Sequence, residues 1–110
     1  PLVICDTGHN VDGIRSIVKQ LATYSYKNLF MIIGMVKDKD HAAVFNLLPK
    51  EAHYFFCQAN IPRTMNAQEL AKEAKAFGLI GAVVPNVNDA LNMALQKAKP
   101  DDLIFVGGST

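Results

Sequence analysis

Side chains able to do chemistry follow the short apolar runs of this 110-residue sequence. Asp6, His9 and Asn10 come directly after the first apolar run, where the aspartate can accept hydrogen bonds from a ribose hydroxyl. The histidine can donate to a phosphate or orient a carboxylate, and the asparagine can cap a helix whose N-terminus favours anions. A plainer interpretation stays open, in which Asp6 and Asn10 only complete turn and cap hydrogen bonds and His9 is a surface residue.

Three later turns carry polar or charged residues in the same kind of position. Lys39 and Asp40 follow the second apolar run, Arg63 follows the third and Ser109 follows the last. Lys39 and Asp40 equally fit a solvated charge run with a helix cap, and Arg63 also fits a surface arginine on a mobile loop. The residues in these turns can belong to one site only if the apolar runs are strands of one sheet and end at the same edge of that sheet.

The elements that would position these residues alternate regularly along the chain. Five apolar runs predict strands at residues 2–5, 29–33, 53–57, 80–84 and 103–106. Between them, residues with helical periodicity follow possible N-caps at Asn10, Asp40, Asn66 and Asn86. This alternation predicts an α/β, Rossmann-like, mostly parallel sheet with helices on both faces. In such sheets ligands bind beyond the carboxyl ends of the strands, which is where the candidate residues lie.

Composition excludes several classes of protein. The net charge is +1 and the basic residues are scattered, so we expect no nucleic-acid partner and no anionic membrane as partner. No apolar run approaches the roughly 20 residues of a membrane helix. Cys5 and Cys57 both lie in apolar runs and predict reduced core thiols in a cytoplasmic protein.

Several familiar catalytic motifs are missing from the sequence. It has no P-loop, no Gly-x-Gly-x-x-Gly after the first strand and no Gly-x-Ser-x-Gly elbow. Its three histidines and two cysteines lack the spacing of metal ligands, so we expect no metal ligands in this chain. The chain by itself is therefore not expected to be a complete enzyme.

Four segments, taken together and in order, resemble one known family. They are Asp-Thr-Gly-His-Asn at 6–10, Gly-Met-Val-Lys-Asp-Lys-Asp at 34–40, Pro-Arg at 62–63 and Phe-Val-Gly-Gly-Ser-Thr at 105–110. The chain resembles the C-terminal domain of folylpolyglutamate synthase and dihydrofolate synthase, members of the Mur ligase superfamily. The resemblance implies that residues 1–110 are a single C-terminal domain, a fragment of a longer chain.

That resemblance also implies a reaction. These enzymes use ATP to phosphorylate a carboxylate of dihydropteroate or a folate, and the amine of L-glutamate then attacks the acyl phosphate to form an amide. The P-loop and the Mg²⁺ ligands belong to an N-terminal domain that is absent here and would act in cis. We accordingly expect the isolated domain to be inactive, and the enzyme to be a monomer.

The residue roles follow from the matched motifs. Asp6 is expected to contact the ATP ribose, His9 to be catalytic near the phosphates or the glutamate, and Asn10 to shape the turn of the ATP site. A second group would bind glutamate or the other substrate, with Arg63 pairing in bidentate fashion with a glutamate carboxylate. This group consists of Lys39, Asp40, Arg63 and Ser109.

Two alternatives to a folate–glutamate ligase remain. One is the equivalent domain of another Mur-type amide ligase, acting on a cell-wall or other carboxylate; the matches at Pro62-Arg63 and Lys39-Asp40 favour the folate branch. The other is a non-catalytic, receiver-like or nucleotide-sensing α/β module. A receiver requires an acidic cluster around one strand-end aspartate, and Asp6 has no acidic companion in the turn that follows the first strand.

Overall fold

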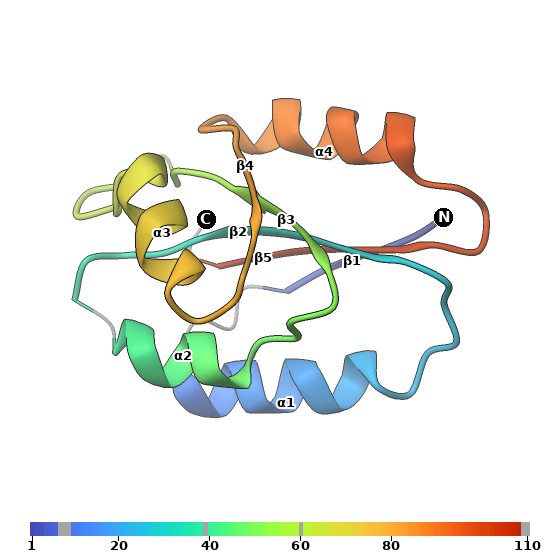
Figure 1. Cartoon of the computed structure of the whole chain (residues 1–110), viewed down its shortest axis with the longest axis horizontal. Coiled ribbons are helices and arrows are strands. Elements are labelled where there is room, and N and C mark those ends of the chain that lie inside the picture. Colours follow the sequence, from blue (N-terminus) through green and yellow to red (C-terminus); the bar gives the residue numbers. More distant parts are fainter. Residues whose placement is uncertain (7–9, 39, 60, 109–110) are drawn as a thin grey trace.

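The five predicted strands form one parallel sheet in the computed structural model (Figure 1), which describes residues 1–6, 10–38, 40–59 and 61–108. The strand order is β1-β5-β2-β3-β4, and every pair of neighbours is parallel. The strands are β1 (Leu2–Cys5), β2 (Leu29–Gly34), β3 (His53–Phe56), β4 (Gly81–Val83) and β5 (Leu103–Gly108). The predicted α/β fold class is therefore confirmed.

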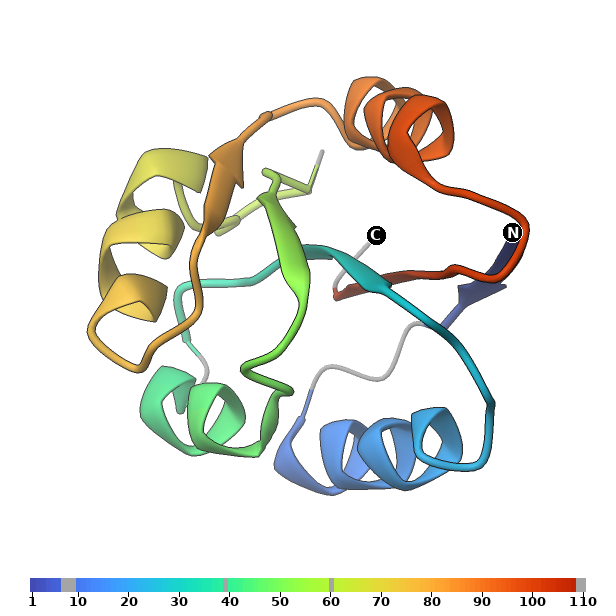
Figure 2. The same cartoon turned by 45° about the vertical axis from the view of Figure 1, so that its right-hand side comes forward.

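Within the described residues, four helices cover the sheet unequally (Figures 1 and 2). They are α1 (Val11–Leu21), α2 (His41–Leu47), α3 (Ala67–Lys75) and α4 (Val87–Lys97). The first three pack on one face and α4 packs alone on the other. The reason is that the chain moves across the sheet in one direction from β1 to β4 and then returns to insert β5, so a right-handed crossover places the last helix on the opposite face.

The central strand β2 shows why the apolar runs are continuous. All six of its residues are buried, because alternate side chains enter the two cores. Met31 and Ile33 join the core beneath α1, α2 and α3, whereas Phe30 and Ile32 join the core beneath α4. In β3, Tyr54, Phe55 and Phe56 are also buried.

The edge strand β1 corrects one expectation. Its unbroken apolar run predicts a strand covered on both faces, but Leu2, Val3 and Cys5 are exposed. The prediction of a core thiol is accordingly wrong for Cys5 and confirmed for Cys57, where burial raises the thiol pKa to about 11. Apolar composition alone does not tell an edge strand from a central one.

All four predicted N-caps are confirmed by side-chain hydrogen bonds to backbone N–H groups of the first helical turn. The acceptors are Asn10 for Gly13 (2.7 Å), Asp40 for Ala43 (3.2 Å), Asn66 for Gln68 (2.9 Å) and Asn86 for Asp89 (3.0 Å). Each bond contributes about 1 kcal/mol to stability. Because each helix starts after a strand, these caps lie along the carboxyl edge of the sheet.

The amino edge is held by a carboxylate that the sequence did not reveal as special. Asp102, only 4% exposed, accepts hydrogen bonds from the backbone N–H of Lys99 (2.9 Å), the backbone N–H of Asn28 (3.0 Å) and Asn28 Nδ2 (3.2 Å). The backbone N–H of Lys99 is the main reason why the pKa of the Asp102 carboxyl is below its usual range. This residue fixes the start of β5 against the start of β2.

Among the described residues, none of the helices has the length and apolar character needed to cross a bilayer.

Candidate functional site at the carboxyl edge

Asp6 lies at the end of β1, on the edge where the parallel strands terminate (left in Figure 1). Its backbone N–H donates to the Val106 carbonyl (3.0 Å), which continues the β1–β5 ladder by one residue. The side chain is exposed. Asn10, four residues on, uses its Oδ1 atom as the cap of α1. The cap interpretation of Asn10 is therefore confirmed, and the exposed Asp6 carboxylate stays a candidate ligand.

The end of β5 lies between Asp6 and the next candidate loop. This strand extends to Gly108, two residues beyond the predicted end, and Gly108 pairs with Gly34 at the end of β2. A side chain at Gly107 would collide with the Phe105 ring, which would have to move to make room for it. Three glycines consequently keep this part of the edge free of side chains.

Two loops beyond this edge are joined by backbone hydrogen bonds, and we call residues 35–38 and 61–65 the paired loops. The Lys37 N–H donates to the Arg63 carbonyl (2.8 Å), and the Met65 N–H donates to the Met35 carbonyl (2.7 Å). Between them, Val36 and Thr64 form an antiparallel bridge. The ends of β2 and β3 are thus tied together where the sequence predicted two separate turns.

Arg63 stands out in the paired loops by its backbone and by its partner. Its φ of 62° lies in the left-handed region, which costs a residue other than glycine about 1–2 kcal/mol. Its Nη1 atom lies 2.6 Å from Asp38 Oδ2, although both side chains are largely exposed. Such conformations persist where the surroundings impose them and cluster at functional sites. The structure therefore strengthens Arg63 as a candidate and adds Asp38, which we had not singled out.

Asp40 follows the first of the paired loops and caps α2, as its alternative interpretation predicts. Its role in binding a substrate stays a prediction. The other three predicted site residues, His9, Lys39 and Ser109, lie outside the described residues.

His41 is a further residue that sequence reasoning missed. It begins α2, its side chain is 16% exposed, and both ring nitrogens have partners. Nε2 lies 2.9 Å from the Val36 carbonyl oxygen and Nδ1 lies 3.1 Å from Glu73 Oε1 on α3. The contact with Glu73 is not foreseeable from spacing, because Glu73 is 32 residues away in the chain.

In residues 1–6, 10–38, 40–59 and 61–108, no three His, Cys, Asp or Glu side chains are grouped so that they could hold a metal ion.

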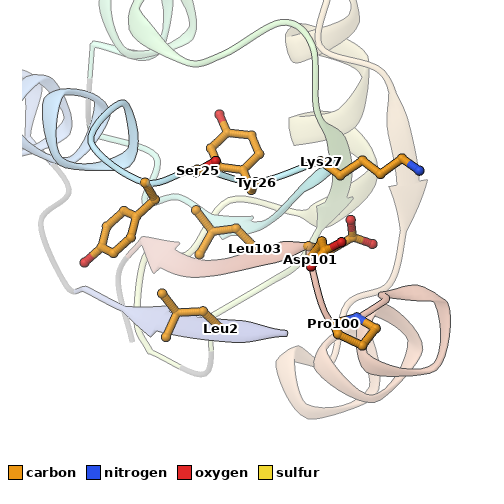
Figure 3. A pocket seen from close by; sticks show the side chains of 9 residues that line it. Leu2, Ser25, Tyr26, Lys27, Pro100, Asp101 and Leu103 are labelled. Atoms are coloured by element: carbon orange, nitrogen blue, oxygen red, sulfur yellow. The ribbon is translucent and has the colours of Figure 1, made fainter.

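A pocket of about 420 Å³ lies at the opposite, amino edge of the sheet (Figure 3). It is lined by Leu2, Tyr24–Lys27 and Pro100–Leu103. Leu2 and Leu103 supply apolar walls, and Lys27 and Asp101 lie at one end. None of the predicted site residues contributes to it, so this pocket is separate from the candidate site.

Comparison with known families decides the relationship. The model of the "Mur ligase, glutamate ligase domain" family matches residues 1–110. The chain belongs to this family. The resemblance in the four motifs is thereby confirmed over the whole chain, including the predicted fold class.

Individual relatives of this Mur ligase domain come from two branches. A probable bifunctional folylpolyglutamate synthase/dihydropteroate synthase of Halobacterium salinarum is 32% identical over 99% of the chain. A bifunctional folylpolyglutamate synthase/dihydrofolate synthase from Yersinia pestis, solved with AMPPNP and a Mn ion, is 28% identical over 99% of the chain with a TM-score of 0.86. A UDP-N-acetylmuramoyl-L-alanyl-D-glutamate–2,6-diaminopimelate ligase of Prochlorococcus marinus is 26% identical over 98% of the chain.

The Mur ligase domain spans only part of each of these proteins. It covers 14% of the Halobacterium protein, 22% of the Prochlorococcus protein and 26% of the solved Yersinia chain.

Proposed function

We propose that this chain is the C-terminal domain of an ATP-dependent ligase that adds L-glutamate to dihydropteroate or a folate. The observation that carries the proposal is the match of the whole chain to the glutamate ligase domain family, together with relatives of the folylpolyglutamate synthase type. In this reaction a substrate carboxylate attacks the γ-phosphorus of ATP and releases ADP. The amine of glutamate then attacks the acyl phosphate, forms the amide and releases phosphate.

The carboxyl edge would supply contacts to two of the substrates. The exposed Asp6 carboxylate is placed at a strand end, where it can accept hydrogen bonds from the ATP ribose. His9, three residues later, would donate to the charge that develops on the phosphates or on the glutamate. Asn10 supports this turn by capping α1. We therefore assign the β1 end to ATP.

The paired loops would receive the glutamate. Arg63 presents an exposed guanidinium, which can bind a carboxylate with two parallel hydrogen bonds. Asp38 holds that guanidinium in the free domain, so glutamate binding would exchange one carboxylate partner for another. Lys39, Asp40 and Ser109 complete the proposed substrate contacts, with Asp40 also serving as the cap of α2.

The divalent metal does not fit the described residues of this chain, because they contain no cluster of ligands for it. We place the Mg²⁺ ligands and the P-loop in an N-terminal domain of the same polypeptide. The enzyme would act as a monomer in the cytoplasm, where ATP and folates are present, and the isolated C-terminal domain would not turn over.

A second candidate function is that of a cell-wall amide ligase, favoured by the similarity to the diaminopimelate ligase of Prochlorococcus. It uses the same phosphoryl chemistry with another carboxylate and another amine. We rank it second because the Halobacterium and Yersinia relatives of the folate type are 32% and 28% identical to the chain, whereas this ligase is 26% identical.

The deciding experiment uses the complete protein that contains this chain. ATP and Mg²⁺ are added together with one carboxylate substrate and one amine substrate at a time. We expect ADP release coupled to amide formation with L-glutamate and dihydropteroate or tetrahydrofolate. A UDP-linked peptide with diaminopimelate serves as the comparison. Amide formation only with the UDP-linked pair would establish the second function, and no amide with either pair would overturn both.

A further inference from the structure

The ring of His41 is enclosed by groups from three segments. It packs against the buried Phe45 ring of α2, with ring centroids 6.2 Å apart. Its Nε2 atom faces the Val36 carbonyl oxygen in the first of the paired loops, and its Nδ1 atom faces the Glu73 carboxylate on α3. The ring thereby connects α2, α3 and the loop that follows β2.

The two contacts of this ring set a requirement on its protonation. A backbone carbonyl oxygen only accepts hydrogen bonds, and so does an ionised carboxylate. A neutral imidazole carries one N–H and can satisfy only one of them. Both contacts of His41 are satisfied together only by the imidazolium, which donates from both nitrogens.

The segment that His41 holds is the one that orients Arg63. Val36 accepts from His41 through its carbonyl group and bridges Thr64 on the opposite loop. On either side of this bridge, Lys37 donates to the Arg63 carbonyl and Met65 donates to the Met35 carbonyl. The left-handed residue Arg63 thus pairs with a loop that His41 contacts through the Val36 carbonyl oxygen.

We propose that protonated His41, bridging Glu73 and the Val36 carbonyl, is a positioning residue that locks the paired loops in the arrangement in which Arg63 receives the incoming amino acid. The inference rests on the proposed function for the role of Arg63. Loss of the ring proton leaves a lone pair on one nitrogen facing an acceptor oxygen, and this loosens the lock. The lock therefore depends on the ring proton, so it should weaken as the pH rises.

Other charged residues lie on the segments around the ring, and a pH effect has to be separated from them. They are Glu69 and Lys72 on α3, Lys37, Asp38 and Asp40 beside α2, and Arg63 in the second of the paired loops. Among the described residues, Glu73 is the charged group that forms an ion pair with the ring. Changing Glu73 therefore tests the lock more selectively than changing its neighbours does.

The substitution Glu73→Gln gives a sharp test, because glutamine offers both an acceptor oxygen and a donor N–H. The amide can donate to the unprotonated Nδ1 of a neutral ring, so the bridge no longer needs the imidazolium. In the complete protein, we measure KM for L-glutamate between about pH 6 and about pH 8. The ratio of the wild-type KM to the E73Q KM should rise about tenfold over this range, and dividing the two cancels the titration of glutamate itself.

Glu51→Gln is the matched control, since it removes an exposed carboxylate beyond α2, near the amino edge. The ratio of the wild-type KM to the E51Q KM should stay constant with pH. A flat ratio for E73Q as well would overturn the proposal. A pH-dependent ratio for both variants would overturn it too, because the effect would then be a general effect of charge.

A second measurement uses the wild-type protein and so does not depend on whether a variant folds. Nitrogen NMR of the complete protein, selectively labelled in histidine, should show both His41 nitrogens protonated at about pH 6, with one of them losing its proton as the pH is raised. A neutral ring at the lower pH would overturn the proposal. If Arg63→Ala leaves KM for L-glutamate unchanged, the role assigned to Arg63 fails instead, and the NMR titration still decides whether the lock exists.

Discussion

The two edges of the sheet use carboxylates in opposite ways. At the amino edge, Asp102 is buried and all its hydrogen bonds come from groups that belong to the fold. At the carboxyl edge, Asp38 and Arg63 are exposed, pair through side chains and depend on a left-handed residue. An exposed ion pair contributes about 1 kcal/mol or less to stability. The charged groups at the carboxyl edge are therefore accessible to a ligand and add little to the stability of the fold. The carboxylate at the amino edge is inaccessible and stabilises the fold.

The largest expected effect comes from removing the guanidinium at the carboxyl edge. In the complete protein, Arg63→Ala should raise KM for L-glutamate by roughly 10- to 100-fold, because a hydrogen-bonded charge pair contributes about 1.5–3 kcal/mol. The melting temperature should change little, since the ion pair is exposed. Steady-state kinetics and thermal melts check this. An unchanged KM for L-glutamate would contradict the binding role of Arg63. A large fall in melting temperature would contradict the view that this ion pair adds little stability.

Removing the carboxylate at the amino edge should give the opposite result. Asp102→Ala leaves the N–H groups of Lys99 and Asn28 without their acceptor, so the melting temperature should fall clearly while KM for each substrate stays the same. A variant with normal stability and impaired kinetics would contradict the assignment of this edge to the fold.

The same residue predicts a dependence of stability on pH. Because the pKa of Asp102 is lower in the folded protein, ionised Asp102 stabilises the fold above the pKa of the unfolded chain. This contribution should be lost as the pH falls below about 4. Denaturant unfolding of wild type and Asp102→Ala at decreasing pH measures it, and the two stabilities should converge. Curves that stay parallel throughout would contradict the prediction.

A pair of substitutions at Arg63 separates its backbone from its side chain. Arg63→Gly and Arg63→Ala both remove the guanidinium, so both should raise KM for L-glutamate equally. The glycine variant should be more stable than the alanine variant by about 1 kcal/mol, because only glycine adopts a φ of 62° without a steric cost. Equal stabilities in denaturant unfolding would show that this backbone is not strained.

The smallest effect concerns Asp40. Asp40→Ala should lose about 1 kcal/mol of stability with the cap of α2, and Asp40→Asn should keep that stability because its side chain still accepts from Ala43. Thermal melts of the two variants check this. If both variants melt at the same temperature as wild type, the cap contributes nothing.

Local patterns predicted most of the fold. The apolar runs, the four caps and the order of elements are short-range features, and the structure confirms them. The exposure of β1 was not predictable in the same way, because an edge strand is defined by the neighbours it lacks.

The candidate site was less predictable, for a physical reason. Strand ends correctly indicated which edge carries Asp6, Asp40 and Arg63. The pairing of Arg63 with Asp38, the left-handed backbone at Arg63 and the contact between His41 and Glu73 all depend on segments that meet only after β2 and β3 align. The spacing of residues within one segment does not predict contacts between segments that are distant in the sequence.

The central claim, that the carboxyl edge binds the substrates of a ligase, is tested most directly at Asp6. In the complete protein, KM for ATP is measured for wild type and Asp6→Ala beside their melting temperatures. We predict a rise in KM for ATP of about tenfold, the effect of about 1.4 kcal/mol, in a variant that stays folded at the assay temperature. ATP kinetics that are identical in the two proteins would contradict the account.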